Sequence, residues 1–327
     1  MFIGLDLGTS GLRGLLVDGA GTLVGSADAA YGVAHPHKGW SEQDPQSWTQ
    51  ALEVVMATLR DSFPDAFAAV QGIGISGHMH GATLLNTNGD VLRPCILWND
   101  TRSYVEAAAL DAIPMFRSLT GSIVFPSFTA PKLQWVAKYE PDIFKQIAKV
   151  LLPKDYMSYW LTGAYSADMS DSAGTSWLDV GARDWSDDLL EATGLSRSQM
   201  PTLFEGSQVV GTVRSDLASD YGLPIGVQVV AGGGDNAVAA CGVGAMSEGT
   251  GFVSLGTSGV LLAGRDGFTP MADSAVHTFC HAVPDQWYQM GVVLAATDSL
   301  NWLSGITGQT AIEVRPTKLI DIFMIIF

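Results

Sequence analysis

Basic residues are scarce in this sequence. It holds 17 lysines and arginines against 33 aspartates and glutamates, which gives a formal net charge of −16 at pH 7. No basic stripe is present, which argues against a nucleic acid as a partner. A nucleoside triphosphate would have to bind through backbone amides and Mg²⁺, because the overall field repels it.

Cysteines and long apolar runs are also few. The three cysteines, Cys95, Cys241 and Cys280, are widely spaced, which suggests reduced thiols in a cytoplasmic protein. No basic segment precedes the first apolar run and Asp6 interrupts that run, so a secretory signal peptide is not expected. No apolar run reaches transmembrane length, so we expect no membrane partner.

Apolar residues, by contrast, are plentiful. They make up 47% of the 327 residues, whereas charged residues make up 15%, a composition typical of globular proteins. A chain of this length can bury a large core and is expected to divide into two domains.

The first informative stretch is residues 2–17, FIGLDLGTSGLRGLLV. It predicts a strand that reaches Asp6, a tight turn from Gly8 to Gly11, and a second strand. The two glycines allow positive φ and leave backbone N–H groups uncovered, so the turn could hold phosphate oxygens. A carboxylate just before such a turn suggests an intervening cation such as Mg²⁺. An ordinary hairpin with a surface aspartate is the alternative.

The same turn recurs far along the chain. Residues 7–19, LGTSGLRGLLVDG, and residues 255–267, LGTSGVLLAGRDG, are identical at seven of thirteen positions. The two copies are separated by about the length of one domain. They predict a nucleotide held between two related domains, with coincidence between two hairpins as the alternative.

A third stretch, residues 227–240, reads VQVVAGGGDNAVAA. It predicts an apolar strand, a sharp exit through three glycines, and a helix of small residues that begins at Asp235. Backbone amides at the helix start are expected to lower the pKa of Asp235 and keep it ionised. A simple helix cap is the alternative.

Eight segments in this order carry a family resemblance: DLGTS, SGHMHG, ILWND, FTAPKLQW, LLPKDY, DMSDSAGTSWLD, AGGGDNA and SLGTSG. From residue 1 to about residue 309 the chain resembles the FGGY carbohydrate kinase family, and most of all its xylulose-phosphorylating members. The resemblance implies an α/β, actin-like ATPase (ribonuclease H-like) fold, with a mixed, mostly buried sheet that has helices on both faces. It also implies two related domains, the second incomplete. Residues 1–244 would form the domain that binds sugar and phosphate, residues 245–310 would form the start of the ATP-binding domain, and residues 311–327 would be an atypical tail.

The implied reaction is phosphorylation of D-xylulose by ATP with Mg²⁺, giving D-xylulose 5-phosphate. The resemblance makes Asp235 the general base and places Asp6, with Asp235 beside it, at the metal. The implied sugar-binding residues are Met79, His80, Trp98, Asn99, Asp100 and Asn236. The implied phosphate-binding residues are Gly8, Thr9, Ser10, Gly11, Arg13, Gly256, Thr257 and Ser258. A homodimer is an open alternative to a monomer.

Several local patterns have competing interpretations. The formal G-x-G-x-x-G at residues 72–77 coincides with a predicted strand, so we consider a dinucleotide site and an NAD-linked oxidoreductase weak alternatives. His277 and His281 flank a cysteine, but no fourth zinc ligand is near in sequence. Asp100 could cap a helix over residues 101–112, and Lys154 with Asp155 is interpreted as a surface pair of little energetic value.

The last segment departs from the family. Residues 319–327, LIDIFMIIF, are apolar and β-prone, and we expect the tail to be out of frame or an artefact of truncation. The chain could therefore also be a non-catalytic sugar-binding fragment that lacks the adenine site, or a kinase for another ketose or polyol.

Overall fold

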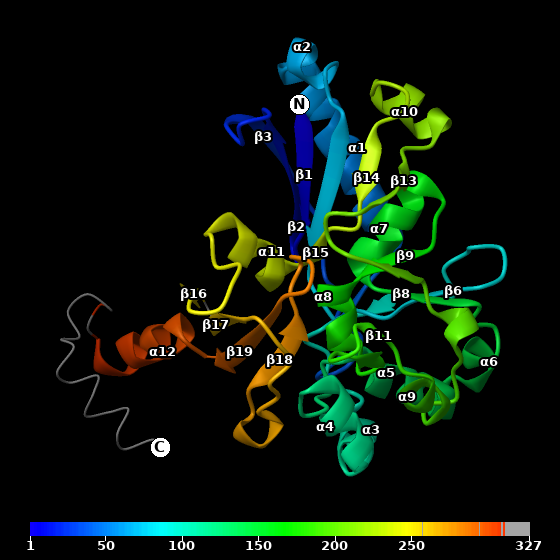
Figure 1. Cartoon of the computed structure of the whole chain (residues 1–327), viewed down its shortest axis with the longest axis vertical. Helices are drawn as coiled ribbons and strands as arrows, with labels where there is room; N and C mark the ends of the chain where they lie inside the picture. The colour runs from blue at the N-terminus through cyan, green and yellow to red at the C-terminus, as the bar shows by residue number, and fades with distance from the viewer. Residues whose placement is uncertain (257, 294, 309, 311–327) are drawn as a thin grey trace.

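The computed structural model describes residues 1–310 except 257, 294 and 309. Two sheets organise the described chain (Figure 1). The larger, seven-stranded sheet contains both chain segments that carry Asp6 and Asp235, and the smaller, four-stranded sheet follows them in sequence.

The larger sheet is mixed, as expected. Its strand order is β13-β14-β5-β1-β2-β3, and β15 pairs with β5 beyond the end of β14. β1, β2 and β3 form an antiparallel meander, whereas β1, β14 and β15 all run parallel to β5. The bounds are β1 Phe2–Leu7, β2 Gly11–Val17, β3 Leu23–Ala30, β5 Gly72–Gly77, β13 Val209–Thr212, β14 Gln228–Val230 and β15 Gly233–Gly234.

Helices cover only one face of β1 and β2 in the described chain. Along β1, Ile3, Leu5 and Leu7 are buried, whereas the alternating residues Phe2 and Asp6 are exposed. The buried face packs in one core with α1 (Pro45–Ser62) and α7 (Pro153–Thr162). The expectation of helices on both faces is therefore wrong for this part of the sheet. Buried and exposed residues alternate along β1 because one face of the sheet packs on the core and the other faces solvent.

The start of α1 follows from local chemistry. Asp44 accepts a hydrogen bond from the backbone N–H of Gln46 at 2.9 Å, and Pro45 occupies the first helical position. Both residues suit a helix start, since the cap satisfies a free N–H and proline needs none. Trp48 and Leu52 then fall on the buried side of the helix.

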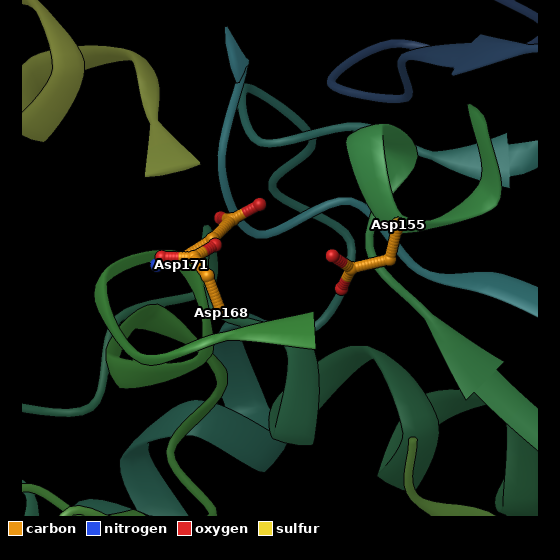
Figure 2. A group of neighbouring side chains, drawn as sticks. All are labelled: Asp155, Asp168 and Asp171. Carbon is orange, nitrogen blue, oxygen red and sulfur yellow. Dashed lines mark hydrogen bonds between the residues drawn. The ribbon is translucent and has the colours of Figure 1, made fainter. Parts of the chain in front are cut away.

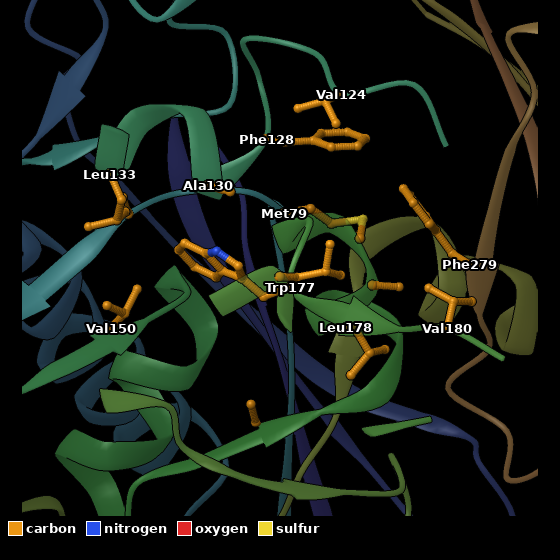
Figure 3. Close-up of a cluster of buried hydrophobic side chains, with 14 of the residues drawn as sticks. Met79, Val124, Phe128, Ala130, Leu133, Val150, Trp177, Leu178, Val180 and Phe279 are labelled. Carbon is orange, nitrogen blue, oxygen red and sulfur yellow. The ribbon is translucent and has the colours of Figure 1, made fainter. Parts of the chain in front are cut away.

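The smaller sheet shares its core with the helical part of the chain. Its order is β16-β17-β19-β18, all antiparallel. Phe279 lies 6.1 Å from Phe128, measured between ring centres, and Figure 3 draws both near Met79. The bounds are β16 Gly251–Leu255, β17 Gly259–Arg265, β18 His277–Cys280 and β19 Trp287–Val293. The two hydrophobic cores therefore do not divide at residue 244, and the domain boundary stays a prediction.

The remaining elements surround these sheets. No helix in the described ranges is both long and apolar enough to cross a membrane. The shorter strands are β4 Glu42–Gln43, β6 Thr83–Leu85, β7 Cys95–Ile96, β8 Lys149–Leu151, β9 Ser166–Asp168, β10 Leu178–Asp179, β11 Asp184–Trp185 and β12 Thr202–Phe204. The other helices are α2 Pro64–Phe67, α3 Tyr104–Asp111, α4 Pro114–Thr120, α5 Thr129–Tyr139, α6 Pro141–Phe144, α8 Met169–Ser172, α9 Asp187–Glu191, α10 Ser215–Tyr221, α11 Asp235–Gly242 and α12 Thr297–Thr307.

Candidate active site

Strand register places Asp6 and the segment before Asp235 on either side of β5. Asp6 in β1 pairs with Ser76, and Ser76 also pairs with Gly233 in β15. Neighbouring strands are about 4.8 Å apart, so the backbones at positions 6 and 233 are roughly 10 Å apart. The side chain of Ser76 donates a hydrogen bond to Asp6 at 2.8 Å. The carboxyl ends of these parallel strands therefore bring the two predicted acidic residues to one edge of the sheet.

The glycines before Asp235 are required by close packing. Gly232 has φ +75°, and a Cβ atom there would lie 1.9 Å from the carbonyl oxygen of Ile75. A Cβ on Gly234 would lie 3.0 Å from the Cγ and Sδ of Met79. Glycine alone fits at position 232, and Met79 is thereby packed directly against the segment that carries Asp235.

Asp235 is the first residue of α11 and keeps part of its surface accessible. Burial raises its pKa to about 6, and the carboxylate of Asp6 adds to this. The backbone and side-chain N–H groups of Asn236 oppose the shift, at 2.7 and 2.8 Å from one oxygen of Asp235. The expected net lowering of this pKa is therefore wrong: the backbone amide of Asn236 does lower it, but desolvation outweighs that effect. Such a carboxyl group titrates close to neutral pH, which suits a general base.

The first glycine turn is held by several side chains. Gly8 N–H donates to the carbonyl of Gly11 at 3.0 Å, and the hydroxyl of Tyr31 donates to the carbonyl of Gly8 at 2.6 Å. Thr9 accepts from Gln43 on its carbonyl and from the Nε1 of Trp98 on its hydroxyl. Trp98, a predicted sugar residue, is thus joined to the predicted phosphate turn.

Neither Gly8 nor Gly11 uses the positive φ that glycine allows. Gly11 is instead required by close approach, since a Cβ there would lie 2.8 Å from the carbonyl oxygen of Ala29. Ser10 is exposed, and so is Arg13, which pairs with Asp28 at 2.6 Å. Arg13 faces Asp6 across the β1–β2 ladder.

The second glycine turn joins β16 and β17, as expected. Gly256 N–H donates to the carbonyl of Ser258 at 2.9 Å. The backbone N–H and hydroxyl of Thr297 both donate to the carbonyl of Gly256, at 3.0 and 2.5 Å. Thr257 lies outside the described residues. The second turn is therefore fastened to the start of α12, whereas the first is fastened to β3 and the segment around Trp98.

Met79 and His80 lie where β5 turns back. His80 has φ +71°, its Nδ1 lies 2.8 Å from the carbonyl of Gly174, and its ring stacks on Phe128 at 4.7 Å. Burial, with help from the ammonium of Lys132, lowers the pKa of His80 to about 3. The imidazole is therefore neutral and can exchange hydrogen bonds with a neutral polyol.

Asp100 has a different environment from its neighbours. Trp98 is partly accessible and Asn99 is exposed, but Asp100 is buried. The Asp100 carboxylate accepts from Ser41 N–H at 2.6 Å and from three nitrogens of Arg102, the backbone N, Nε and Nη2. The helix it was expected to cap begins only at Tyr104 with Ser103 in the cap position, so that interpretation is wrong. The carboxylate oxygens of Asp100 are therefore already hydrogen-bonded within the protein.

Lys154 and Asp155 are not a surface pair, and this prediction is wrong. Both are buried, and the ammonium of Lys154 lies 2.5 Å from Asp155 and 2.7 Å from Asp168. Burial disfavours the ammonium, but the carboxylates outweigh it and raise the pKa of Lys154. The helix start follows β8, whose last two residues are buried, and this position in the sequence was the available signal that Lys154 and Asp155 are buried.

Asp171 completes this buried group. Its two carboxylate oxygens are buried and have no hydrogen-bond partner among the described residues. Burial raises its pKa well above the usual range, and Asp155, Asp168 and Asp235 act in the same direction although Lys154 opposes them. Figure 2 shows Asp168 and Asp171 together on one segment, with Asp155 opposite. Oxygens of the three lie within 4.8 Å of one another, but the Lys154 ammonium already supplies the cation.

Two alternatives can be compared with this geometry. β5 is followed by a turn and the short strand β6, with no helix after its glycines, so the dinucleotide interpretation is wrong. In the described ranges, the group whose side chains lie close enough together to hold a metal ion consists of Asp155, Asp168 and Asp171. His277 and His281 are not part of this group.

Comparison with known proteins assigns the family. Residues 1–242 match the N-terminal domain of the FGGY family of carbohydrate kinases. The chain belongs to this family. The matched range includes Asp6, Met79, His80 and Asp235, whereas the second glycine turn lies beyond it.

Similar FGGY kinases are known from several bacteria. The chain is 50% identical to the xylulose kinase of Escherichia coli over 309 residues, covering 94% of this chain and 63% of that relative. It is 48% identical to the xylulose kinase of Klebsiella pneumoniae over 95% of this chain and 64% of the relative. The chain thus spans less than two thirds of the length of these curated relatives.

Solved structures agree with this assignment of the fold. A protein from Brucella ovis described as a xyloylose kinase is 58% identical with a TM-score of 0.93, over 94% of this chain and 64% of that one. The xylulose kinase of Rhodospirillum rubrum is 28% identical with a TM-score of 0.89, over 94% and 63%. The chain therefore has the actin-like ATPase fold of the FGGY kinases, with the second domain present in part.

Proposed function

We propose that this chain carries the sugar-side half of a kinase that transfers the γ-phosphoryl group of ATP to D-xylulose. The observation that supports this most directly is the environment of Asp235. Its pKa is about 6, it is partly accessible, and its segment packs against Met79 on one side of β5 while Asp6 lies on the other. Relatives at 48–50% identity named xylulose kinase support the choice of sugar.

In the proposed reaction, Asp235 accepts the proton of a sugar hydroxyl. The hydroxyl oxygen then forms a bond to the γ-phosphorus, and the bond from that phosphorus to the ADP oxygen breaks. Met79, His80, Trp98 and Asn99 would orient the sugar, and Asn236 would hold the base in place through its two hydrogen bonds. Asp100 would act indirectly, because Arg102 and Ser41 engage its carboxylate.

The residues present suit Mg²⁺, which prefers oxygen ligands and binds few protein groups directly. The side chain of Asp6 is accessible and is oriented by Ser76 at 2.8 Å. Asp6 would hold the metal with Asp235 nearby, and a bound Mg²⁺ would offset charge on the phosphates. It would also lower the pKa of Asp235, which the Asp6 carboxylate raises.

The phosphates would bind at the two glycine turns, residues 8–11 and 256–258, with Arg13 beside the first. The N–H groups of Gly8 and Gly256 close the turns themselves, so other backbone N–H groups of the turns would hold the phosphates. In this proposal residues 1–244 form the sugar and phosphate domain, residues 245–310 open the ATP-binding domain, and residues 311–327 lie outside the described chain. A homodimer is a separate prediction that sedimentation would test.

A second candidate is sugar binding without phosphoryl transfer. It is supported by the match of residues 1–242 to the N-terminal domain of the family, which contains Met79, His80 and Asp235. Calorimetry with D-xylulose, then with a nonhydrolysable ATP analogue, separates the two candidates. Sugar binding without nucleotide binding favours this second one.

The decisive experiment is an ADP-release assay over a panel of pentuloses and polyols, with Asp235→Asn as the test variant. Removing the base should lower kcat by about 10²–10⁴-fold while the affinity for the sugar changes little. Asp61→Asn is the matched control, since Asp61 is exposed and pairs with Arg60. Equal activity of Asp235→Asn and the unsubstituted chain would contradict the proposed role.

A further inference from the structure

The segment that delivers Asp235 is held at both ends by side chains. Lys154 Nζ donates to the carbonyl of Ala231 at 3.3 Å, before the sharp glycine. Gly234 N–H donates to the hydroxyl of Ser170 at 3.1 Å, directly before Asp235. Three consecutive glycines impose little conformational restriction of their own, so these two contacts, together with the backbone pairing of the segment, limit where it can move.

One carboxylate joins the two contacts. Asp168 Oδ2 accepts from the hydroxyl of Ser170 at 2.5 Å and from its backbone N–H at 2.7 Å. Asp168 Oδ1 lies 2.7 Å from the ammonium of Lys154. Lys154, Asp168 and Ser170 thus form one continuous chain beneath the glycines, in which an ion pair joins Lys154 to Asp168 and charge-assisted hydrogen bonds join Asp168 to Ser170. We name this chain the 154–168–170 clamp.

The clamp is fully enclosed. Lys154, Asp168 and Ser170 are 1%, 0% and 0% exposed, so water does not compete for these hydrogen bonds. Gly234 is the residue that precedes α11, and no side chain of its own caps that helix. The hydroxyl of Ser170 therefore supplies a side-chain acceptor for a buried N–H group directly before the helix.

We propose that Ser170, oriented by Asp168 and Lys154, is a positioning residue that sets the direction of the Asp235 carboxylate. The role in catalysis rests on the proposed function of Asp235, whereas the clamp itself does not. A catalytic group displaced by about 1 Å can lose on the order of 10²-fold in rate, so a loosened Gly234 should affect turnover more than sugar binding.

Three serine variants test the clamp without any substrate. Ser170→Ala removes the acceptor of Gly234 N–H, and Ser170→Thr retains a hydroxyl. Ser172→Ala is the matched control, because Ser172 lies on the same short helix, is equally buried, and its hydroxyl has no described partner. Amide hydrogen exchange of residues 231–236 is the measurement.

We expect exchange at residues 231–236 to be about tenfold faster in Ser170→Ala, with Ser170→Thr close to the unsubstituted chain and Ser172→Ala unchanged. Equal acceleration in Ser170→Ala and Ser172→Ala would overturn the clamp. If Ser170→Thr folds poorly, comparison of the two alanine variants still tests the clamp, because both variants remove one buried serine hydroxyl.

Turnover then tests the positioning role. In the ADP-release assay we expect kcat to fall about tenfold or more in Ser170→Ala while the KM for the sugar changes less than twofold. A kcat equal to that of Ser172→Ala, despite faster exchange, would overturn the positioning role. Absence of turnover in the unsubstituted chain would instead overturn the proposed function, and hydrogen exchange would still decide on the clamp.

Discussion

Two buried lysines each lie in the first turn of a helix, but one is surrounded by carboxylates and the other by neutral carbonyl groups. Lys154 lies in the first turn of α7 and Lys132 in the first turn of α5, and both are almost completely buried. Lys154 contacts the carboxylates of Asp155 and Asp168. Within the described part of the chain, Lys132 donates to two carbonyl oxygens, those of His80 and Ser127.

The difference decides the charge of each side chain. Burial lowers the pKa of Lys132 to about 7, and the distant acidic groups only partly oppose it. For Lys154 burial acts in the same direction, but two adjacent carboxylates raise the pKa above its usual value. One lysine is thus a permanent cation beneath the Asp235 segment, whereas the other titrates near neutral pH beneath the His80 turn.

The largest effect is expected from Lys154→Met. It leaves Asp155 and Asp168 buried without their cation, which should lower the free energy of unfolding by about 3–5 kcal/mol. Urea denaturation measures this, and Lys145→Met, which removes an exposed ammonium, is the control. A loss below about 1 kcal/mol would show that the buried pair is not maintained in solution.

Lys132→Met should cost less. It removes one hydrogen-bond donor from each of two carbonyl oxygens but leaves no uncompensated carboxylate, so we expect a loss of about 1–3 kcal/mol. The hydroxyl of Thr129 still donates to the carbonyl of His80 at 3.1 Å, which limits the damage. Affinity for the sugar should also fall, because the His80 turn is loosened. If this variant were as unstable as Lys154→Met, the comparison would fail.

The third expected effect is a difference in pH dependence. Between the folded pKa of Lys132, about 7, and its usual 10.5, the unfolded lysine binds a proton that the folded one has lost. Stability therefore rises with pH in this window, by at most about 1.4 kcal/mol per pH unit. Lys132→Met should remove this slope in urea titrations between about pH 7 and 9.

Lys154 should show the opposite dependence. Its folded pKa lies above the usual 10.5, so its contribution is complete below that pH and decreases as the pH rises beyond it. A slope between about pH 7 and 9 that persists in Lys132→Met would mean that another group produces it.

Short-range patterns were predictable from the sequence. The strand to Asp6, the cap at Asp44 and the strand, glycines and helix around Asp235 each depend on neighbours a few residues away. Secondary structure, caps and sharp turns are local consequences of side-chain shape and backbone freedom. The family resemblance added the order of these pieces along the chain.

Long-range electrostatics were not predictable in the same way. Lys154 and Asp155 resemble an exposed pair in sequence, yet the partners of Lys154 include Asp168 and a carbonyl 77 residues away. The direction of the pKa shift at Asp235 likewise depends on how much protein surrounds it. Neither burial nor the presence of a distant carboxylate can be deduced from adjacent residues.

The sequence by itself therefore determined where the carboxylates of Asp6 and Asp235, the glycine turns and the proposed sugar-binding residues Met79 and His80 occur along the chain. Only the tertiary structure decided which of the charged groups are buried and what compensates them. The physical reason is that hydrogen bonding and backbone geometry act between neighbours in sequence, whereas desolvation and charge pairing depend on the atoms that folding brings close.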